Sequence, residues 1–147
     1  MIPVVVTAVT ADPIDVAALV ARIRRPECGG LVAFEGSTRS PSGGKRVERL
    51  EYEAWIERAE EQLSGLAREA AQTYGLGGVV AVHRTGVVPI GEPSVLVAAS
   101  SAHRAQAFEA ARWLIDTIKA QASIWKKEIF DVGEAWANMD GPGRDDS

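Results

Sequence analysis

The segment at residues 78–101 has the sequence GVVAVHRTGVVPIGEPSVLVAASS, and it predicts two β-strands. Its valine-rich runs favour extended backbone, and the Pro and Gly residues between them favour a turn. Short β-branched or alternating runs recur on both sides of this segment and predict further strands. These runs lie at residues 4–9, 29–36, 46–55 and 123–130.

Three helices are expected between these strands. Asp12 is suited to cap the first helix and Pro13 to begin it, while Pro26 marks its limit. Apolar residues recur at helical spacing in the segments at residues 56–74 and 103–121. Strands and helices follow one another without a regular βαβ repeat, which predicts the α+β class with a largely antiparallel sheet.

The length of 147 residues suits one domain with one hydrophobic core. No linker or internal repeat divides the sequence. Residues 1–140 are therefore expected to form a single domain, with about three helices and a small subdomain of strands. The last residues, 141–147, have the sequence GPGRDDS and are expected to be a disordered tail.

The composition argues against several functional classes. A net charge of −4 argues against bulk binding to nucleic acid or to an anionic membrane surface. No apolar run approaches the roughly 20 residues that span a bilayer, and the N-terminal residues do not resemble a signal peptide. The single cysteine, Cys28, fits a reducing cytoplasm and is expected to be an inert buried residue. With two histidines and one cysteine, no zinc site is expected, and no other metal or cofactor either.

Three lysines lie within the sequence KAQASIWKKE, which begins at Lys119. On a helix, Lys119 shares a stripe with Ile115, at the edge of an apolar face. The ordinary interpretation is a lysine at a helix end, where a cation suits the helix dipole. Lys126 and Lys127 point to opposite faces of a strand, and alternation alone does not choose which of them could join Lys119 in a pocket.

Other basic residues form candidate anion sites. Arg39 follows a strand, in a loop rich in Ser and Gly that could bind phosphate. His103 and Arg104 begin the third helix, where the free amides attract anions. Arg104 and Lys119 are fifteen residues apart, about 22 Å along a helix. If both belong to one site, the site is expected to lie between two subunits.

Taken together, the motifs resemble the large, catalytic subunit of molybdopterin synthase, the MoaE family. The resemblance runs from about residue 29 to residue 136. It rests on the ordered sequences FEGSTRSPSGG, LEYEAW, HRTGVVPIGEPSVLVAASSAHRAQAF and DTIKAQASIWKKE.

The resemblance implies a fold of the α/β-hammerhead type and a defined reaction. Family members convert cyclic pyranopterin monophosphate (precursor Z) into molybdopterin by inserting two sulfurs as a dithiolene. The sulfur arrives as a thiocarboxylate on the C-terminal Gly of a small ubiquitin-like subunit of the MoaD type, whose tail enters a pocket of the large subunit. The large subunit forms a homodimer, with one small subunit at each end.

The resemblance also implies roles for individual residues. The two key lysines of the family match Lys119 and Lys126, which leaves Lys127 at the surface. The residues that bind the phosphate and the pterin match Arg39, His103 and Arg104, and an aromatic position near the tail pocket matches Phe34. The family commonly has Pro where Ser123 stands, and this departure is expected to loosen the turn into the last strand.

Two other functions are compatible with the sequence. A non-catalytic α+β module could bind an anionic ligand or a peptide tail through the same basic helix start. An enzyme that forms a Schiff base could use Lys119 without any ubiquitin-like partner. Binding of single-stranded RNA is disfavoured by the negative charge and the sparse aromatic residues.

Overall fold

The computed structural model describes residues 1–131 and 133–138. Its helices and strands follow in the order β1 (Val4–Thr10), α1 (Val16–Ala21), β2 (Gly30–Ser37), β3 (Val47–Ala54), α2 (Ile56–Tyr74), β4 (Gly78–Arg84), β5 (Gly86–Pro89), β6 (Pro93–Ser101), α3 (Arg104–Gln121), β7 (Ile124–Phe130) and β8 (Gly133–Asn138). No helix in this described part of the chain is long and apolar enough to cross a membrane.

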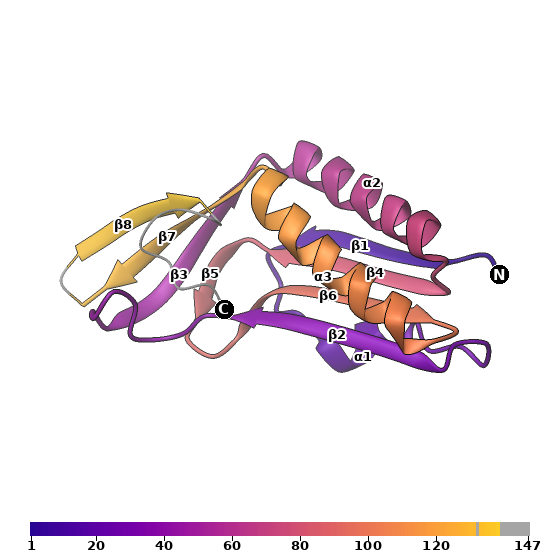
Figure 1. The fold of residues 1–147 in the computed structure, drawn as a ribbon. Helices are drawn as coiled ribbons and strands as arrows, with labels where there is room; N and C mark the ends of the chain where they lie inside the picture. The colour runs from indigo at the N-terminus through magenta and orange to yellow at the C-terminus, as the bar shows by residue number, and fades with distance from the viewer. Residues whose placement is uncertain (132, 139–147) are drawn as a thin grey trace.

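The first sheet has the strand order β1-β4-β6-β2. β1 pairs in parallel with β4, whereas the other two pairs are antiparallel. The central strands β4 and β6 come from the valine-rich segment at residues 78–101, and nearly all of their residues are buried. Helices cover both faces of this sheet: α2 and α3 lie over one face and α1 lies over the other (Figure 1). Burial on both faces explains why these strands are apolar throughout instead of alternating.

The second sheet has the strand order β5-β3-β7-β8, and all of its pairs are antiparallel. It extends from the first sheet at the end of α3 (Figure 1). Leu50, Tyr52 and Val88 form its buried face, together with Ile124. This sheet is the small subdomain of strands expected from the sequence, and the predicted α+β class with largely antiparallel pairing is confirmed.

The segment at residues 78–101 contains three strands, where the sequence predicted two. The additional strand, β5, pairs with β3 of the second sheet and not with its neighbours in the chain. Gly86 begins β5 and Gly91 follows its end, with φ values of 77° and 85°, a region that favours glycine. These two residues let the chain leave the first sheet and return to it.

The first helix is shorter than predicted. Asp15, not Asp12, is its N-cap, since the Asp15 Oδ1 accepts a hydrogen bond of 3.1 Å from the Ala18 N–H. Ile14 is buried, and this packing holds the preceding residues outside the helix. The end is also earlier, because the N–H groups of residues 22–24 bond to carbonyls three residues back, as in a tight turn.

The two longer helices agree with the prediction. α2 begins and ends as expected, and Gly75 terminates it with φ 63° and ψ 45° while its N–H bonds to the Ala71 carbonyl. α3 begins at Arg104, with His103 as the N-cap residue. Strand β8 was not predicted; it pairs with β7 through the main chain. The tail expected at residues 141–147 lies outside the described residues.

Candidate functional site

Lys119 and Lys126 lie on two consecutive elements that meet where the two sheets join. Lys119 is in the last turn of α3, and Lys126 is the third residue of β7; both are half-buried. The neighbouring Ile118 and Ile124 are 0% and 1% exposed. These two core residues anchor the helix end and the strand start that carry the lysines.

The short connection between α3 and β7 is held by the side-chain amide of Gln62 from α2. Its Nε2 donates to the Gln121 carbonyl at 3.1 Å, and its Oε1 accepts from the Ser123 N–H at 2.8 Å. The Ser123 carbonyl also accepts from the Trp55 N–H. Ser123 was expected to loosen this turn, but its N–H makes a bond that a proline could not make.

Lys126 and Lys127 lie on opposite faces of the second sheet. Lys126 pairs with the buried Tyr52, on the face that packs toward the first sheet. Glu128, which is 7% exposed, lies two residues after Lys126 in β7 and shares that face. Lys127 pairs with Glu51 on the opposite face, beside the exposed Trp125. Only Lys126 therefore lies on the face toward the junction.

Arg39 and Phe34 come from β2 and the loop that follows it. β2 ends on the side of the first sheet from which the second sheet extends (Figure 1), and the exposed Arg39 follows two residues after the last residue of β2. Hydrogen bonds of Thr38 with Gly91 and Glu92 hold the start of this loop. Phe34 is half-buried on β2 and packs against the core under α2 and α3.

His103 and Arg104 lie at the other end of α3, far from the lysines of the same chain (Figure 1). Both side chains are exposed. The start of α3 is fixed by a hydrogen bond from the Ser101 hydroxyl to the His103 carbonyl and by close packing on Gly30. Within one chain, Lys119 and Lys126 therefore lie at the junction of α3 and β7, whereas His103 and Arg104 lie at the opposite end of α3.

A buried polar cluster at the junction was not identified as part of the site from the sequence. His83 is fully buried, and burial lowers its pKa to about 4, against the effect of its hydrogen bond to the Arg84 carbonyl. Arg84 is 7% exposed and forms an ion pair of 2.7 Å with Glu92. In the sequence, the available sign of this pair was Glu92, which follows Arg84 by eight residues.

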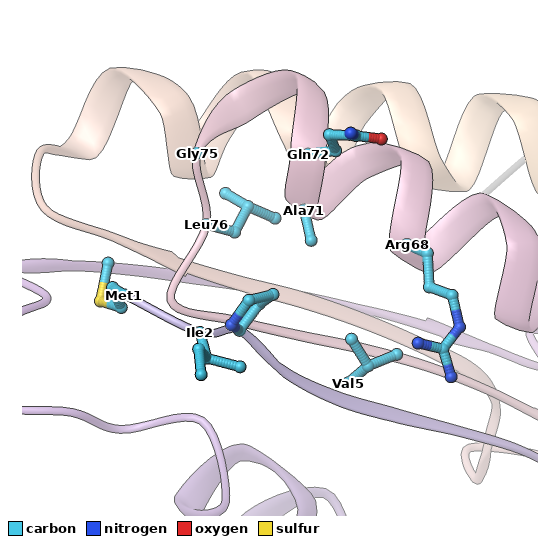
Figure 2. A pocket seen from close by; sticks show the side chains of 9 residues that line it. Met1, Ile2, Val5, Arg68, Ala71, Gln72, Gly75 and Leu76 are labelled. Atoms are coloured by element: carbon cyan, nitrogen blue, oxygen red, sulfur yellow. The ribbon is translucent and has the colours of Figure 1, made fainter.

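A hollow of about 640 Å³ lies away from the lysines, between the N-terminal residues and the end of α2 (Figure 2). Its lining is mostly apolar and includes Ile2, Val5 and Leu76. It contains none of the residues expected to act in the site.

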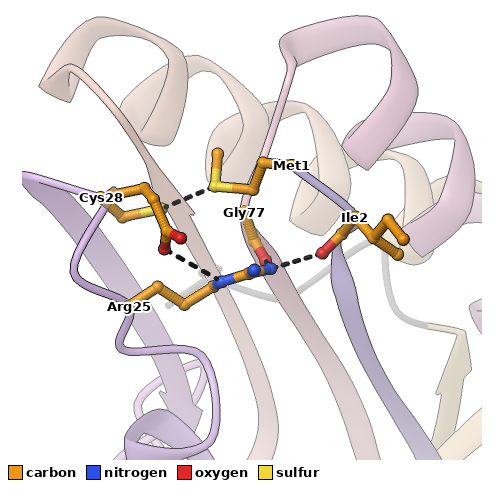
Figure 3. A network of polar contacts seen from close by, with 6 residues as sticks. Met1, Ile2, Arg25, Cys28 and Gly77 are labelled. Atoms are coloured by element: carbon orange, nitrogen blue, oxygen red, sulfur yellow. Dashed lines mark hydrogen bonds and ion pairs between the residues drawn. The ribbon is translucent and has the colours of Figure 1, made fainter.

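Cys28 also lies at this distant end of the molecule. Its Sγ is 3.8 Å from the Met1 Sδ and packs closely on Gly77, while the Arg25 guanidinium donates to the Ile2 and Gly77 carbonyls (Figure 3). The contacts join the N-terminal residues to the start of β4. They give Cys28 a structural environment remote from Lys119 and Lys126.

Comparisons with known proteins identify the family. Residues 9–121 match the MoaE protein family. The molybdopterin synthase catalytic subunit of Thermoplasma volcanium is 46% identical over 122 residues, which cover 83% of this chain and 87% of that relative. The subunit of the same name from Oryza sativa subsp. japonica is 46% identical over 84% of this chain, and the chain spans about 64% of the length of that relative.

A solved structure supports the same assignment. The crystal structure of molybdopterin synthase from Staphylococcus aureus superimposes with a TM-score of 0.81 and 34% sequence identity. The match covers 88% of this chain and 94% of that one. On its fold and on its sequence, the chain belongs to the MoaE family.

Proposed function

We propose that this chain is the catalytic subunit of a molybdopterin synthase. It transfers sulfur from the C-terminal thiocarboxylate of a small ubiquitin-like subunit to cyclic pyranopterin monophosphate, and the product is the dithiolene of molybdopterin. The Thermoplasma volcanium relative, most of whose length the chain covers, is named as a catalytic subunit. A catalytic subunit implies a second subunit, and in this proposal the second subunit supplies the sulfur. The reaction takes place in the cytoplasm.

The observation that carries the proposal is the pair of lysines at the junction of α3 and β7. Both side chains are half-buried and stand on backbone fixed by core isoleucines and by Gln62. An ammonium group held in place stabilises the negative charge that develops when an acyl carbon is attacked. Lys119 acts at the thiocarboxylate carbonyl as the acid–base or electrostatic catalyst, and Lys126 binds the pterin or its phosphate.

The source of the sulfur agrees with the position of the one cysteine. Cys28 lies at the opposite end of the first sheet from the lysines, so the enzyme itself offers no thiol at this site. In each transfer, a bond forms between the sulfur and a pterin carbon while the bond from that carbon to oxygen breaks, and the oxygen leaves as water or stays with the phosphate. The bond between the sulfur and the acyl carbon also breaks. The oxygen of a water molecule takes the place of the sulfur on the acyl carbon, so the tail ends as a carboxylate. Two such transfers complete the dithiolene.

The complete site is shared between two subunits of a homodimer. Arg39 binds the phosphate near the lysines, and Phe34 lies beside the inserted tail. His103 and Arg104 come from the neighbouring subunit, because α3 separates them from Lys119 of their own chain by nearly its full length. Mixing an inactive Lys119→Ala chain with an inactive Arg104→Ala chain restores activity in hybrid dimers, whereas failure of any rescue would contradict a shared site.

Reconstitution tests the proposed reaction. The purified chain is incubated with precursor Z and a thiocarboxylated small subunit, and molybdopterin is detected by its fluorescent oxidised derivative. The expected result is product that depends on the thiocarboxylate and is absent with the unmodified carboxylate. Binding of the small subunit without product would favour a non-catalytic module. Trapping of Lys119 by borohydride with a carbonyl substrate and no partner would favour a Schiff-base enzyme.

A further inference from the structure

Tyr52 lies directly opposite Lys126 in the β3–β7 pair. Paired residues place their Cβ atoms about 5 Å apart on the same face of the sheet. The Tyr52 side chain is 6% exposed, and its ring meets the His83 ring edge-on, with centroids 4.9 Å apart and planes at 70°. Tyr52 therefore forms a fixed wall beside Lys126.

Ser94 lies where the register between β2 and β6 shifts. One residue of β6 is left without a partner in β2 at this point, and that residue is Ser94. Irregularities of this kind bend a strand and redirect a side chain, and they are common beside active sites. The Ser94 hydroxyl is buried, and it lies 3.2 Å from the Tyr52 hydroxyl and 3.2 Å from the Gly36 carbonyl oxygen.

These two hydrogen bonds have one possible direction. The Gly36 carbonyl can only accept, so the Ser94 hydroxyl donates to it. The Ser94 oxygen then accepts from the Tyr52 hydroxyl. The chain of bonds joins β3 of the second sheet to the end of β2 in the first sheet, three residues before Arg39.

We propose that Tyr52, acting through Ser94, is a positioning residue that sets the placement of Lys126 relative to the Arg39 loop. The inference rests on the proposed function, since it assumes that these two cations act on one substrate. Tyr52 is buried beside Lys126 and does not act on the reacting atoms. Its hydroxyl fixes the second sheet, which carries Lys126, against the first sheet, which carries Arg39.

The variant Tyr52→Phe tests this role because it removes only the hydroxyl and keeps the ring beside His83. The matched control is Tyr74→Phe, which changes the other tyrosine of the chain, on α2 next to Trp113. We expect kcat for molybdopterin formation to fall by about tenfold in Tyr52→Phe, since small displacements of catalytic groups slow reactions strongly. KM for precursor Z should change much less, and Tyr74→Phe should match the wild type.

A double-mutant cycle separates positioning from a general loss of stability. Ser94→Ala should lower kcat as Tyr52→Phe does, and the double variant should be no slower than either single variant, because all three break the same chain of bonds. Reductions that multiply in the double variant would overturn the inference. Wild-type kcat in Tyr52→Phe would overturn it as well.

A second measurement does not depend on activity. The rate of acetylation of each lysine, read by mass spectrometry, reports the surroundings of its amine. In Tyr52→Phe, acetylation of Lys126 should become faster while that of Lys127, on the opposite face, stays the same. Unchanged acetylation at both lysines would contradict the role of Tyr52. If the wild type makes no molybdopterin, the proposed function fails, and this comparison still decides whether Tyr52 positions Lys126.

Discussion

Lowering the pH is expected to destabilise this protein through one buried histidine. His83 is 0% exposed, and its Nδ1 lies 2.8 Å from the Arg84 carbonyl oxygen, to which it must donate. In the neutral ring Nε2 therefore carries no proton, and protonating it would place a charge in the core. Burial lowers the pKa of His83 from 6.5 to about 4, although the hydrogen bond to Arg84 opposes this change.

The sign and size of the effect follow from proton linkage. The unfolded chain binds this proton more tightly than the folded chain, so the stabilisation is fully present above pH 6.5 and is lost as the pH falls toward 4. The difference between 6.5 and about 4, at about 1.4 kcal/mol for each pKa unit, gives a total loss of about 3 kcal/mol. The same relation gives a loss of about 2 kcal/mol between pH 7.5 and pH 5.

Urea unfolding followed by circular dichroism at pH 7.5 and pH 5 measures this loss. His83→Gln removes the titrating group, and His103→Gln changes the other histidine, which is exposed. Between pH 7.5 and pH 5, we expect the fall in the free energy of unfolding to be about 2 kcal/mol smaller in His83→Gln than in the wild type. In His103→Gln, the fall should equal that of the wild type. An equal fall in all three proteins would refute the reasoning. If His83→Gln does not fold, an NMR titration of the wild-type His83 ring decides, with an expected midpoint of about 4.

Three further substitutions test the fold and the site. Asp15→Ala removes the cap of α1 and should lower the free energy of unfolding in urea by about 1 kcal/mol, whereas Asp12→Ala should not. Gly30→Ala would place a Cβ 2.8 Å from the backbone of α3 and should lower Tm, whereas Gly65→Ala, which meets open space, should not. Gln62→Leu releases the α3–β7 connection, so it should lower turnover clearly but Tm only slightly. An unchanged turnover would contradict that role.

The long helices could be predicted from the sequence because their apolar residues recur with the helical period over many turns. α2 and α3 accordingly lie where expected. The start of α1 could not be predicted, since two aspartates precede the apolar run and only the packing of Ile14 selects the second. β5 was missed because a strand of only four residues, beginning at Gly86, carries little signal of its own in the sequence. Its partner strand, β3, is about 35 residues earlier in the chain.

The candidate site was predictable only in part. The helical rise alone placed Arg104 and Lys119 at opposite ends of one helix, as the structure has them. Alternation could not distinguish Lys126 from Lys127, because apolar residues lie on both faces of β7; the packing of one face toward the first sheet separates them. The link between Tyr52 and Ser94 depends on a register shift that leaves no sign in the local sequence.

The most direct test of the central claim is a single-turnover assay of Lys119→Ala beside Lys127→Ala. Each variant is mixed in excess with thiocarboxylated small subunit and precursor Z, and molybdopterin is measured against time, with partner binding checked by calorimetry. Lys119→Ala should bind the small subunit like the wild type but form no product, and Lys127→Ala should form product at the wild-type rate. Near-normal product formation by Lys119→Ala would contradict a catalytic role for this lysine.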